Sequence, residues 1–240
     1  MKKQYIFLFL IIIGSKGVTQ QPSPDSLTIV TANKYAVESL KEKARSFDFL
    51  YQGIEYLSYG HGIDGHPYFE TDSFRQGSVR YKGLEFDDSR LLYDIARDQI
   101  IIPNRYSNGM LQLVTAKISS FSIGQRSFVK ITADTTQMDV PAEGFYELAY
   151  NDKTTRLFVK HQKEVKVPAK TDAKPFFNYT ATYFVQKDNR FHAIKNEKDV
   201  LALMPGKKVE IKKIVKEQHL SFRKNKKVYL ITVLNHFLKD

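Results

Sequence analysis

Residues 79–86, Val-Arg-Tyr-Lys-Gly-Leu-Glu-Phe (VRYKGLEF), form the stretch that decides the fold class of this chain. Apolar and polar residues alternate on both sides of Lys82-Gly83, which is the pattern of two half-buried strands. Gly83 permits the positive φ angle that a tight hairpin turn requires. The sequence therefore predicts an antiparallel β-hairpin over these residues.

A similar pattern occurs thirty residues earlier in the chain. Residues 51–56 (YQGIEY) share with residues 81–86 (YKGLEF) the order aromatic, any residue, Gly, apolar, Glu, aromatic. We expect a second hairpin there, with Gln52-Gly53 at the turn. Two copies do not support a solenoid, which needs at least three stacked repeats.

The β pattern extends on both sides of these two hairpins, over residues 47–194. Short runs rich in Tyr, Phe, Ile and Val alternate with turn residues, as in a meander of short strands. We expect this antiparallel meander to form a curved sheet, a sandwich or a barrel-like body. The further runs are residues 90–93, 99–102, 110–115, 117–123, 128–132, 144–150, 155–160, 183–186 and 190–194.

The end of the chain has helical patterns. Asn196 is a good N-cap for a helix that stops at Pro205-Gly206, and residues 209–219 and 225–238 carry apolar stripes of helical spacing. We expect these helices to pack against the β body or against each other. A short helix is also expected within residues 34–47. The predicted fold class is α+β, mainly antiparallel β, followed by a short hairpin and C-terminal helices.

The first nineteen residues have the layout of a secretory signal peptide. Lys2 and Lys3 precede nine apolar residues, 5–13, and small residues follow up to Thr19. A membrane-spanning helix needs about 20 apolar residues, so we expect cleavage before Gln20 rather than an uncleaved anchor helix. No cysteine follows, which excludes a bacterial lipoprotein anchor. The expected location is the periplasm or the medium.

Four regions follow from these patterns. We assign residues 1–19 to the signal peptide, 20–46 to a lead-in that starts with two prolines, 47–194 to the β-rich body and 195–240 to a basic helical segment. The absence of cysteine rules out disulfides, thiolate zinc sites, thiol nucleophiles and iron–sulfur clusters.

Enzyme motifs are sparse. The chain has no G-x-S-x-G nucleophile elbow, no phosphate-binding loop and no H-E-x-x-H, and we expect no cofactor.

A pair of carboxylates can perform acid–base chemistry, but acidic residues are also common at hairpin turns, and we favour the turn interpretation here. The acidic residues concerned are Asp87, Asp88, Asp94 and Asp98.

Residues 60–65 (GHGIDG) match the spacing of a dinucleotide-binding glycine motif. That motif works only between a parallel strand and a helix, and Pro67 follows here, so we expect a glycine loop. The loop also holds an imidazole, a carboxylate and a second imidazole, from His61, Asp64 and His66. If these side chains converge, they could bind a divalent metal and serve a metal-dependent hydrolase.

Positive charge is concentrated in the C-terminal helices. The whole chain has a formal net charge of +11, and residues 197–240 contribute eleven Lys or Arg against five Asp or Glu. The partner that this charge predicts is an anionic lipid or polymer of the cell envelope, or another envelope protein. No nucleic-acid-binding motif accompanies it, and we favour a solvated helical face over such a partner. The candidate residues are Lys207, Lys208, Lys212, Lys213, Lys216, Arg223, Lys224, Lys226 and Lys227.

Four short motifs carry a resemblance to known proteins. They are residues 50–56 (LYQGIEY), 65–69 (GHPYF), 77–83 (GSVRYKG) and 144–148 (GFYEL), and the basic C-terminal helices complete the pattern. Together they resemble a family of exported proteins of the Bacteroidota. The resemblance implies a periplasmic or surface location in a two-membrane bacterium. It implies no activity and no catalytic residues.

The sequence favours a non-catalytic envelope or secreted protein with a binding or structural role. Its 14 Tyr and 17 Phe, with no Trp, fit a packed β body. A binding protein of this kind should have a concave, aromatic-lined pocket on that body. The two alternatives are the metal-dependent hydrolase and an accessory factor that binds anionic lipid or polymer through the basic helices.

Overall fold

The computed structural model describes residues 31–35, 37–39, 50–132, 140–169 and 173–238. The chain divides into two compact units, Met1–Arg45 and Ser46–Asp240. In the first unit, residues 31–35 and 37–39 are helical and exposed. The helix expected over residues 34–47 is thus partly described, and the expected signal peptide lies outside the described residues.

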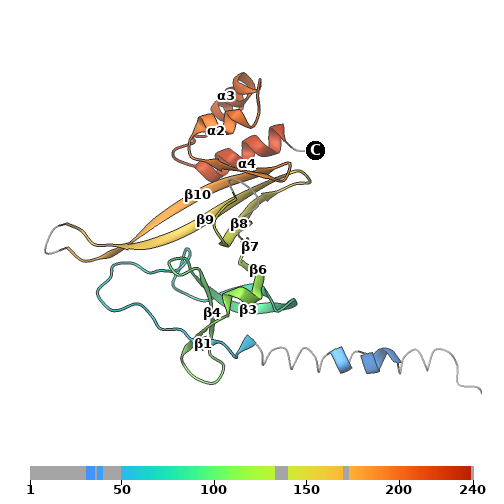
Figure 1. Ribbon diagram of the computed structural model, residues 1–240, viewed down its shortest axis with the longest axis vertical. Coiled ribbons are helices and arrows are strands. Elements are labelled where there is room, and N and C mark those ends of the chain that lie inside the picture. Colours follow the sequence, from blue (N-terminus) through green and yellow to red (C-terminus); the bar gives the residue numbers. More distant parts are fainter. Residues whose placement is uncertain (1–30, 36, 40–49, 133–139, 170–172, 239–240) are drawn as a thin grey trace, which may run out of the picture. The chain divides into compact units, whose positions relative to one another are not determined.

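The second unit is built on an antiparallel sheet of eleven strands (Figure 1). The strand order is β1-β5-β4-β3-β2-β6-β7-β8-β9-β10-β11, and in the described part of the chain β1 and β11 do not pair, so the sheet is open. The strands are β1 (Ile54–Glu55), β2 (Arg75–Tyr81), β3 (Leu84–Asp94), β4 (Gln99–Pro103), β5 (Met110–Gln112), β6 (Ile118–Ile123), β7 (Arg126–Ile131), β8 (Gly144–Asn151), β9 (Thr155–Lys166), β10 (Phe176–Lys187) and β11 (Arg190–Ile194).

The predicted hairpin at residues 79–86 is confirmed. Strands β2 and β3 pair through Tyr81 and Leu84, and both turn residues, Lys82 and Gly83, have positive φ angles of 52° and 82°. Two positive φ angles match the twist of antiparallel strands. Local sequence was therefore sufficient to specify this turn.

The hairpin predicted at residues 51–56 is wrong. Only Ile54 and Glu55 form a strand there, and this strand, β1, pairs with the distant β5 rather than with a strand next to it in sequence. Gly53 is needed for a different reason: a Cβ atom at this position would lie 2.6 Å from the carbonyl oxygen of Gln112. The glycine lets two backbones approach closely, which the sequence alone does not distinguish from a turn.

One core packs against the first half of the sheet and is dominated by aromatic rings. Tyr93, Phe121, Phe128 and Phe145 are all buried. The rings of Phe121 and Phe128 stack with centroids 4.7 Å apart, and Tyr93 meets Phe121 edge-on at 5.1 Å. The expected role of the many Phe and Tyr residues in a packed β body is borne out here.

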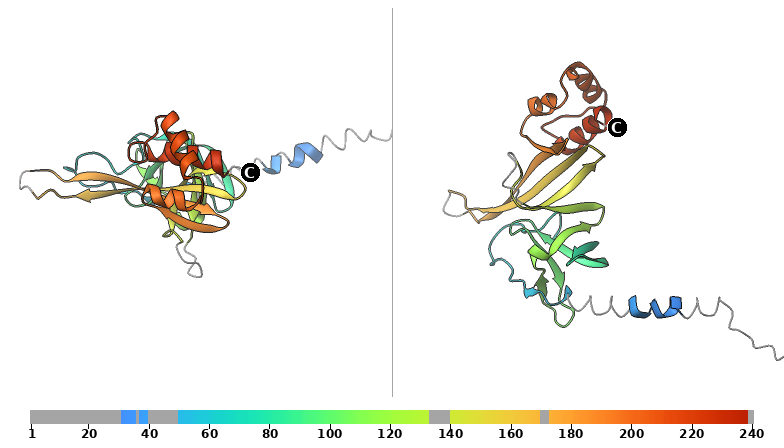
Figure 2. Two further views of the ribbon diagram at one scale, coloured as in Figure 1. Left: turned by 90° about the horizontal axis from the view of Figure 1, so that it is seen from above. Right: turned by 45° about the vertical axis from the view of Figure 1, so that its right-hand side comes forward.

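Three C-terminal helices form a second core with the last strands. They are α2 (Glu197–Ala202), α3 (Lys208–Glu217) and α4 (Lys226–Phe237), and they pack with Leu157 of β9, Val185 of β10 and Ile194 of β11. Figures 1 and 2 show the helices gathered over the end of the β9–β10 ribbon where the chain turns into β11. None of the described helices is long and apolar enough to cross a membrane.

The predicted helix starts are correct, with one difference in detail. Asn196 and Asp199 form a reciprocal capping box at the start of α2. Asn225, the first residue of the predicted helical range 225–238, lies just before α4, and its side chain does not cap that helix. Its Oδ1 instead accepts a hydrogen bond from the Ser221 backbone N–H at 2.7 Å, which closes the loop between α3 and α4.

Gly77 allows β2 to lie against β6. A Cβ atom on Gly77 would lie 1.9 Å from the carbonyl oxygen of Ser122, which no backbone contact tolerates. We predict that Gly77→Ala lowers the free energy of unfolding by about 1–3 kcal/mol, the cost typical of overpacking. Chemical denaturation measures this. Gly60→Ala is the matched control because nothing lies within 4 Å of its added Cβ; equal stability of the two variants would contradict the packing.

Candidate functional site

A cavity of about 370 Å³ lies on the face of the sheet formed by β8, β9 and β10, next to the start of α4. Its wall combines three Phe or Tyr rings and one imidazole with five charged side chains. The lining residues are Phe69, Glu70, Ile95, Arg126, Glu147, His161, Lys163, Tyr179, Tyr183 and Lys227.

Strand register brings the sheet residues of this wall together. Val159 of β9 lies opposite both Glu147 of β8 and Tyr183 of β10. Farther along β9, Lys163 lies opposite Tyr179. Because side chains on a strand alternate between faces, Val159, His161 and Lys163 point to one side of the sheet.

The Glu147 carboxylate is the most densely bonded group in the cavity. Its side chain is 3% exposed, and it accepts hydrogen bonds from Arg126 Nη1 at 3.0 Å, from His161 Nε2 at 2.8 Å and from Lys227 Nζ. Burial alone would raise the pKa of Glu147, but the hydrogen bonds and charges of His161 and Lys227 outweigh it and lower the pKa to about 2. Glu147 is therefore ionised at neutral pH.

A hydrogen-bond chain runs from Glu147 through His161 to Tyr179. The ionised carboxylate can only accept, so His161 Nε2 donates to it. In the neutral imidazole, Nδ1 then accepts from the Tyr179 hydroxyl, 2.7 Å away. Burial raises the pKa of Tyr179 to about 12, so this hydroxyl stays protonated at neutral pH. The chain fixes the orientation of Tyr179 and leaves no phenolate to act as a nucleophile.

The Lys163 ammonium is bonded to carbonyls rather than to a carboxylate. Its Nζ donates to the carbonyl oxygens of His66 at 2.7 Å and Tyr68 at 2.8 Å. Among the described residues it forms no ion pair. Burial lowers the pKa of Lys163, opposed by the charge of Asp94. The third N–H donor of the ammonium meets His66 Nδ1 at a longer Nζ–Nδ1 distance of 3.4 Å, a weaker contact that an anionic ligand could replace.

The charges of the cavity wall do not cancel. Arg126, Lys163 and Lys227 are positive, and Glu70 and Glu147 are negative, which leaves a net charge of +1. Glu70 is also paired with Arg75 at 2.6 Å on the rim. The cavity therefore favours an anionic group over a neutral or cationic one.

The loop residues suggested for a metal site do not form one. His61 and Asp64 are exposed, while His66 Nδ1 accepts from the Tyr68 backbone N–H and lies 3.4 Å from Lys163 Nζ. Burial and the Lys163 charge lower the pKa of His66. Within the described ranges, no group of three His, Asp or Glu side chains could hold a metal ion.

The glycine motif at residues 60–65 forms a loop, as predicted, and no helix opens after it. The backbone of the loop forms two hydrogen bonds with the start of β10. The Asp64 N–H donates to the Pro175 carbonyl at 2.8 Å, and the Phe177 N–H donates to the Asp64 carbonyl at 3.0 Å. The loop is thereby fixed to the edge of β10.

The acidic residues near the turn after β3 support the structure. Asp94 Oδ1 accepts from the backbone N–H groups of Ala96 and Arg97, and its Oδ2 accepts from the Tyr56 hydroxyl. Asp98 accepts from Tyr93 and Lys160. The turn interpretation of these carboxylates is therefore preferred over a catalytic pair.

The nine candidate cations of the C-terminal segment separate into two groups. Lys207 pairs with Glu210 at 3.1 Å, Lys226 stacks over the rings of Tyr183 and Phe222, and Lys227 contacts Glu147. The other six are exposed, and the described residues provide no ion-pair partner for them. They are Lys208, Lys212, Lys213, Lys216, Arg223 and Lys224.

Sequence reasoning missed the cavity residues except for Lys227. A usable signal was present in β9, where Leu157, Val159, His161 and Lys163 share one face. When His161 and Lys163 follow Leu157 and Val159 on the same face of β9, the pattern predicts polar side chains on the buried side of the sheet. Position 147 carries the same signal, since it shares a face with buried Phe145.

Comparisons with protein-family models, with curated proteins and with solved structures find no match for this chain. The geometry of the cavity is therefore the basis for the functional inference.

The low pKa of Glu147 predicts a specific loss of stability in acid. The folded-state pKa of about 2 lies below the ordinary value of 4.5. The contribution of ionised Glu147 to the free energy of unfolding is therefore complete above pH 4.5 and is lost as the pH falls toward 2. We predict that Glu147→Gln is destabilising by about 3 kcal/mol at pH 7, and that this difference shrinks by about 2 kcal/mol at pH 3.

Urea denaturation of both proteins across this pH range makes the measurement. Glu55→Gln, at an exposed glutamate of β1, is the control and should match the wild type at each pH. A Glu147→Gln deficit that stays constant from pH 7 to pH 3 would contradict the low pKa.

Proposed function

We propose that the protein is a non-catalytic binding protein, exported to the periplasm or the cell surface, and that it holds a small organic anion in the cavity beside α4. The observation that carries this proposal is the Lys163 ammonium, which lines the cavity without a carboxylate partner among the described residues. An anionic ligand would give this ammonium the charged partner that it lacks among the described residues.

Aromatic side chains supply the rest of the binding surface. Phe69, Tyr179 and Tyr183 line the cavity, which gives the concave aromatic pocket expected of a binding protein. In the described residues the Tyr183 hydroxyl has no hydrogen-bond partner, and burial raises its pKa, so it remains a donor. The ligand chemistry that fits is a carboxylate or phosphate on an aromatic or aliphatic body.

The same geometry argues against catalysis. Glu147, the one carboxylate buried in the wall, is occupied by three donors and has a pKa of about 2, so it is a poor general base. Tyr179 is held protonated, with a pKa of about 12. These groups position a ligand more readily than they transfer its protons.

Export is supported by the N-terminal sequence. A basic start, a short apolar stretch and small residues before Gln20 match a cleavable signal peptide. The resemblance to exported proteins of the Bacteroidota points to the same compartment.

Calorimetric titration with phenyl phosphate tests the cavity. We predict that phenyl phosphate binds at least tenfold more tightly than phenol, because only the phosphate pairs with Lys163. Octanoate and benzoate should bind as well. A wild-type protein that binds none of these anions, or that binds phenol equally well, would overturn the proposal.

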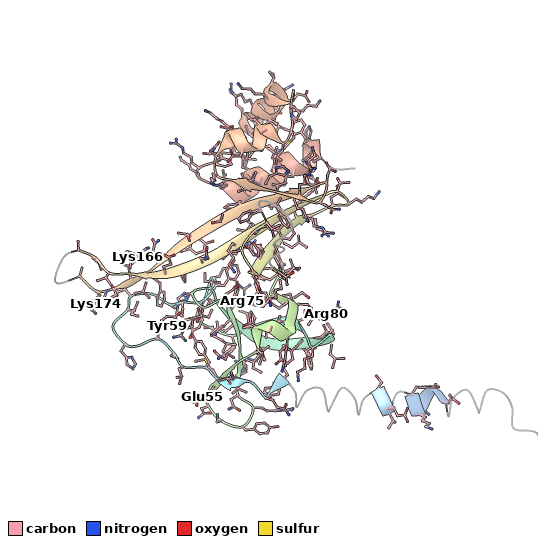
Figure 3. All side chains as sticks on the ribbon, viewed as in Figure 1. Glu55, Tyr59, Arg75, Arg80, Lys166 and Lys174 are labelled. Atoms are coloured by element: carbon pink, nitrogen blue, oxygen red, sulfur yellow. The ribbon has the colours of Figure 1, made fainter. Side chains whose placement is uncertain are left out.

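Two variants locate the binding. Lys163→Met should weaken phenyl phosphate binding at least tenfold, and Tyr183→Phe should weaken it severalfold while keeping the ring. Lys174→Met, at an exposed lysine on the far end of the β9–β10 hairpin, should bind normally (Figure 3). Melting temperatures of all three variants separate lost binding from lost folding.

Expression of the full chain in a two-membrane bacterium tests the location. We predict a mature protein in the periplasmic or surface fraction whose mass corresponds to a start at Gln20. A cytoplasmic protein that retains Met1–Thr19 would contradict export.

A further inference from the structure

The exposed surface of α3 is divided by charge. At about 100° per residue, Lys208, Lys212, Lys213 and Lys216 fall within an arc of about 140°. Glu210 and Glu217 follow on the next arc. The remaining side of the helix is turned to the protein, where Ile211 and Val215 are buried. Cations and acids are therefore separated around the helix rather than mixed.

The loop that follows α3 adds two more cations. Arg223 and Lys224 are exposed between α3 and α4, two helices that pack on each other in the second core. We call the six residues Lys208, Lys212, Lys213, Lys216, Arg223 and Lys224 the basic face. No member has an ion-pair partner among the described residues, so the charge of this face is not neutralised internally.

An apolar side chain lies within the basic face. Val209 falls between the lysines of α3 and is 79% exposed. A polyanion in water would gain nothing from an exposed valine, whereas a bilayer interface accepts an apolar group among cations that contact the headgroups. Valine and lysines together thus favour a lipid surface over a soluble anionic polymer.

We propose that the basic face docks the protein onto a bilayer of anionic phospholipid, with the lysines at the headgroup phosphates and Val209 in the interfacial layer. The interaction is peripheral, reversible and dependent on salt. It is separate from the cavity, because Lys227, the one candidate cation of the C-terminal segment that lines the cavity, contacts Glu147 and is not part of the basic face.

Vesicle co-sedimentation tests this proposal. We expect the purified protein to bind vesicles of phosphatidylglycerol and phosphatidylcholine in equal parts, and to lose this binding in pure phosphatidylcholine and in 0.5 M salt. The combined variant Lys212→Gln, Lys213→Gln and Lys216→Gln should bind the anionic vesicles about a hundredfold more weakly, at about fivefold per lysine.

The matched control carries the same change in charge elsewhere on the molecule. It combines Lys117→Gln, Lys153→Gln and Lys174→Gln, at three exposed lysines of the β body. This control should keep most of the wild-type binding. If both triple variants lose binding equally, net charge rather than the basic face governs the association, and the proposal fails.

Val209→Ser separates a lipid surface from a soluble polyanion. We expect it to weaken binding to the anionic vesicles severalfold and to leave binding to polyphosphate, measured in parallel, unchanged. Unchanged vesicle binding by this variant, or tight wild-type binding to polyphosphate with none to the vesicles, would overturn the lipid assignment.

Discussion

The contacts of the Glu147 carboxylate hold together strands β7 to β9 and helix α4, and this part of the structure depends on them. Glu147 contacts Arg126 of β7, His161 of β9 and Lys227 at the start of α4 while sitting on β8 itself. One buried charge thus joins three successive strands and the last helix. Such a charge is tolerated only when its partners satisfy it, and removing one member leaves the others unpaired in the interior.

The position of this cluster also explains the cavity. His161 packs against Phe69 of the first half of the sheet unit, with ring centroids 4.8 Å apart, and Lys227 lies in the first turn of α4, whose apolar side belongs to the second core. The polar cluster therefore lies where the two apolar cores meet. The cavity lies beside this cluster, and its wall combines the charged side chains with Phe69, Tyr179 and Tyr183.

Features set by neighbouring residues were predictable from sequence. The turn at Lys82-Gly83, the cap at Asn196 and the apolar stripes of the helices each follow from interactions within a few residues. The failed hairpin at residues 51–56 had the same local pattern, but its glycine serves a contact with Gln112, 59 residues away in sequence. Local chemistry does not distinguish these two uses of glycine.

The cavity was not predictable in the same way, since it is assembled from long-range pairings. Glu147, His161 and Tyr179 meet only because the register of β8, β9 and β10 places them together. The basic segment illustrates a further limit: Lys227 and Lys224 look equivalent in sequence, yet one turns inward to Glu147 and the other stays exposed. The position of a lysine in the sequence does not show whether it forms an ion pair with a buried carboxylate.

Glu147 remains an ionised, fully bonded carboxylate inside the folded protein. A carbon-13 NMR titration of the glutamate side-chain carboxyl groups tests it most directly, with Glu147→Gln used to assign the resonance. We predict that the resonance missing from this variant stays at its ionised position down to pH 3. A Glu147 resonance that titrates near the ordinary glutamate pKa of 4.5 would contradict this prediction.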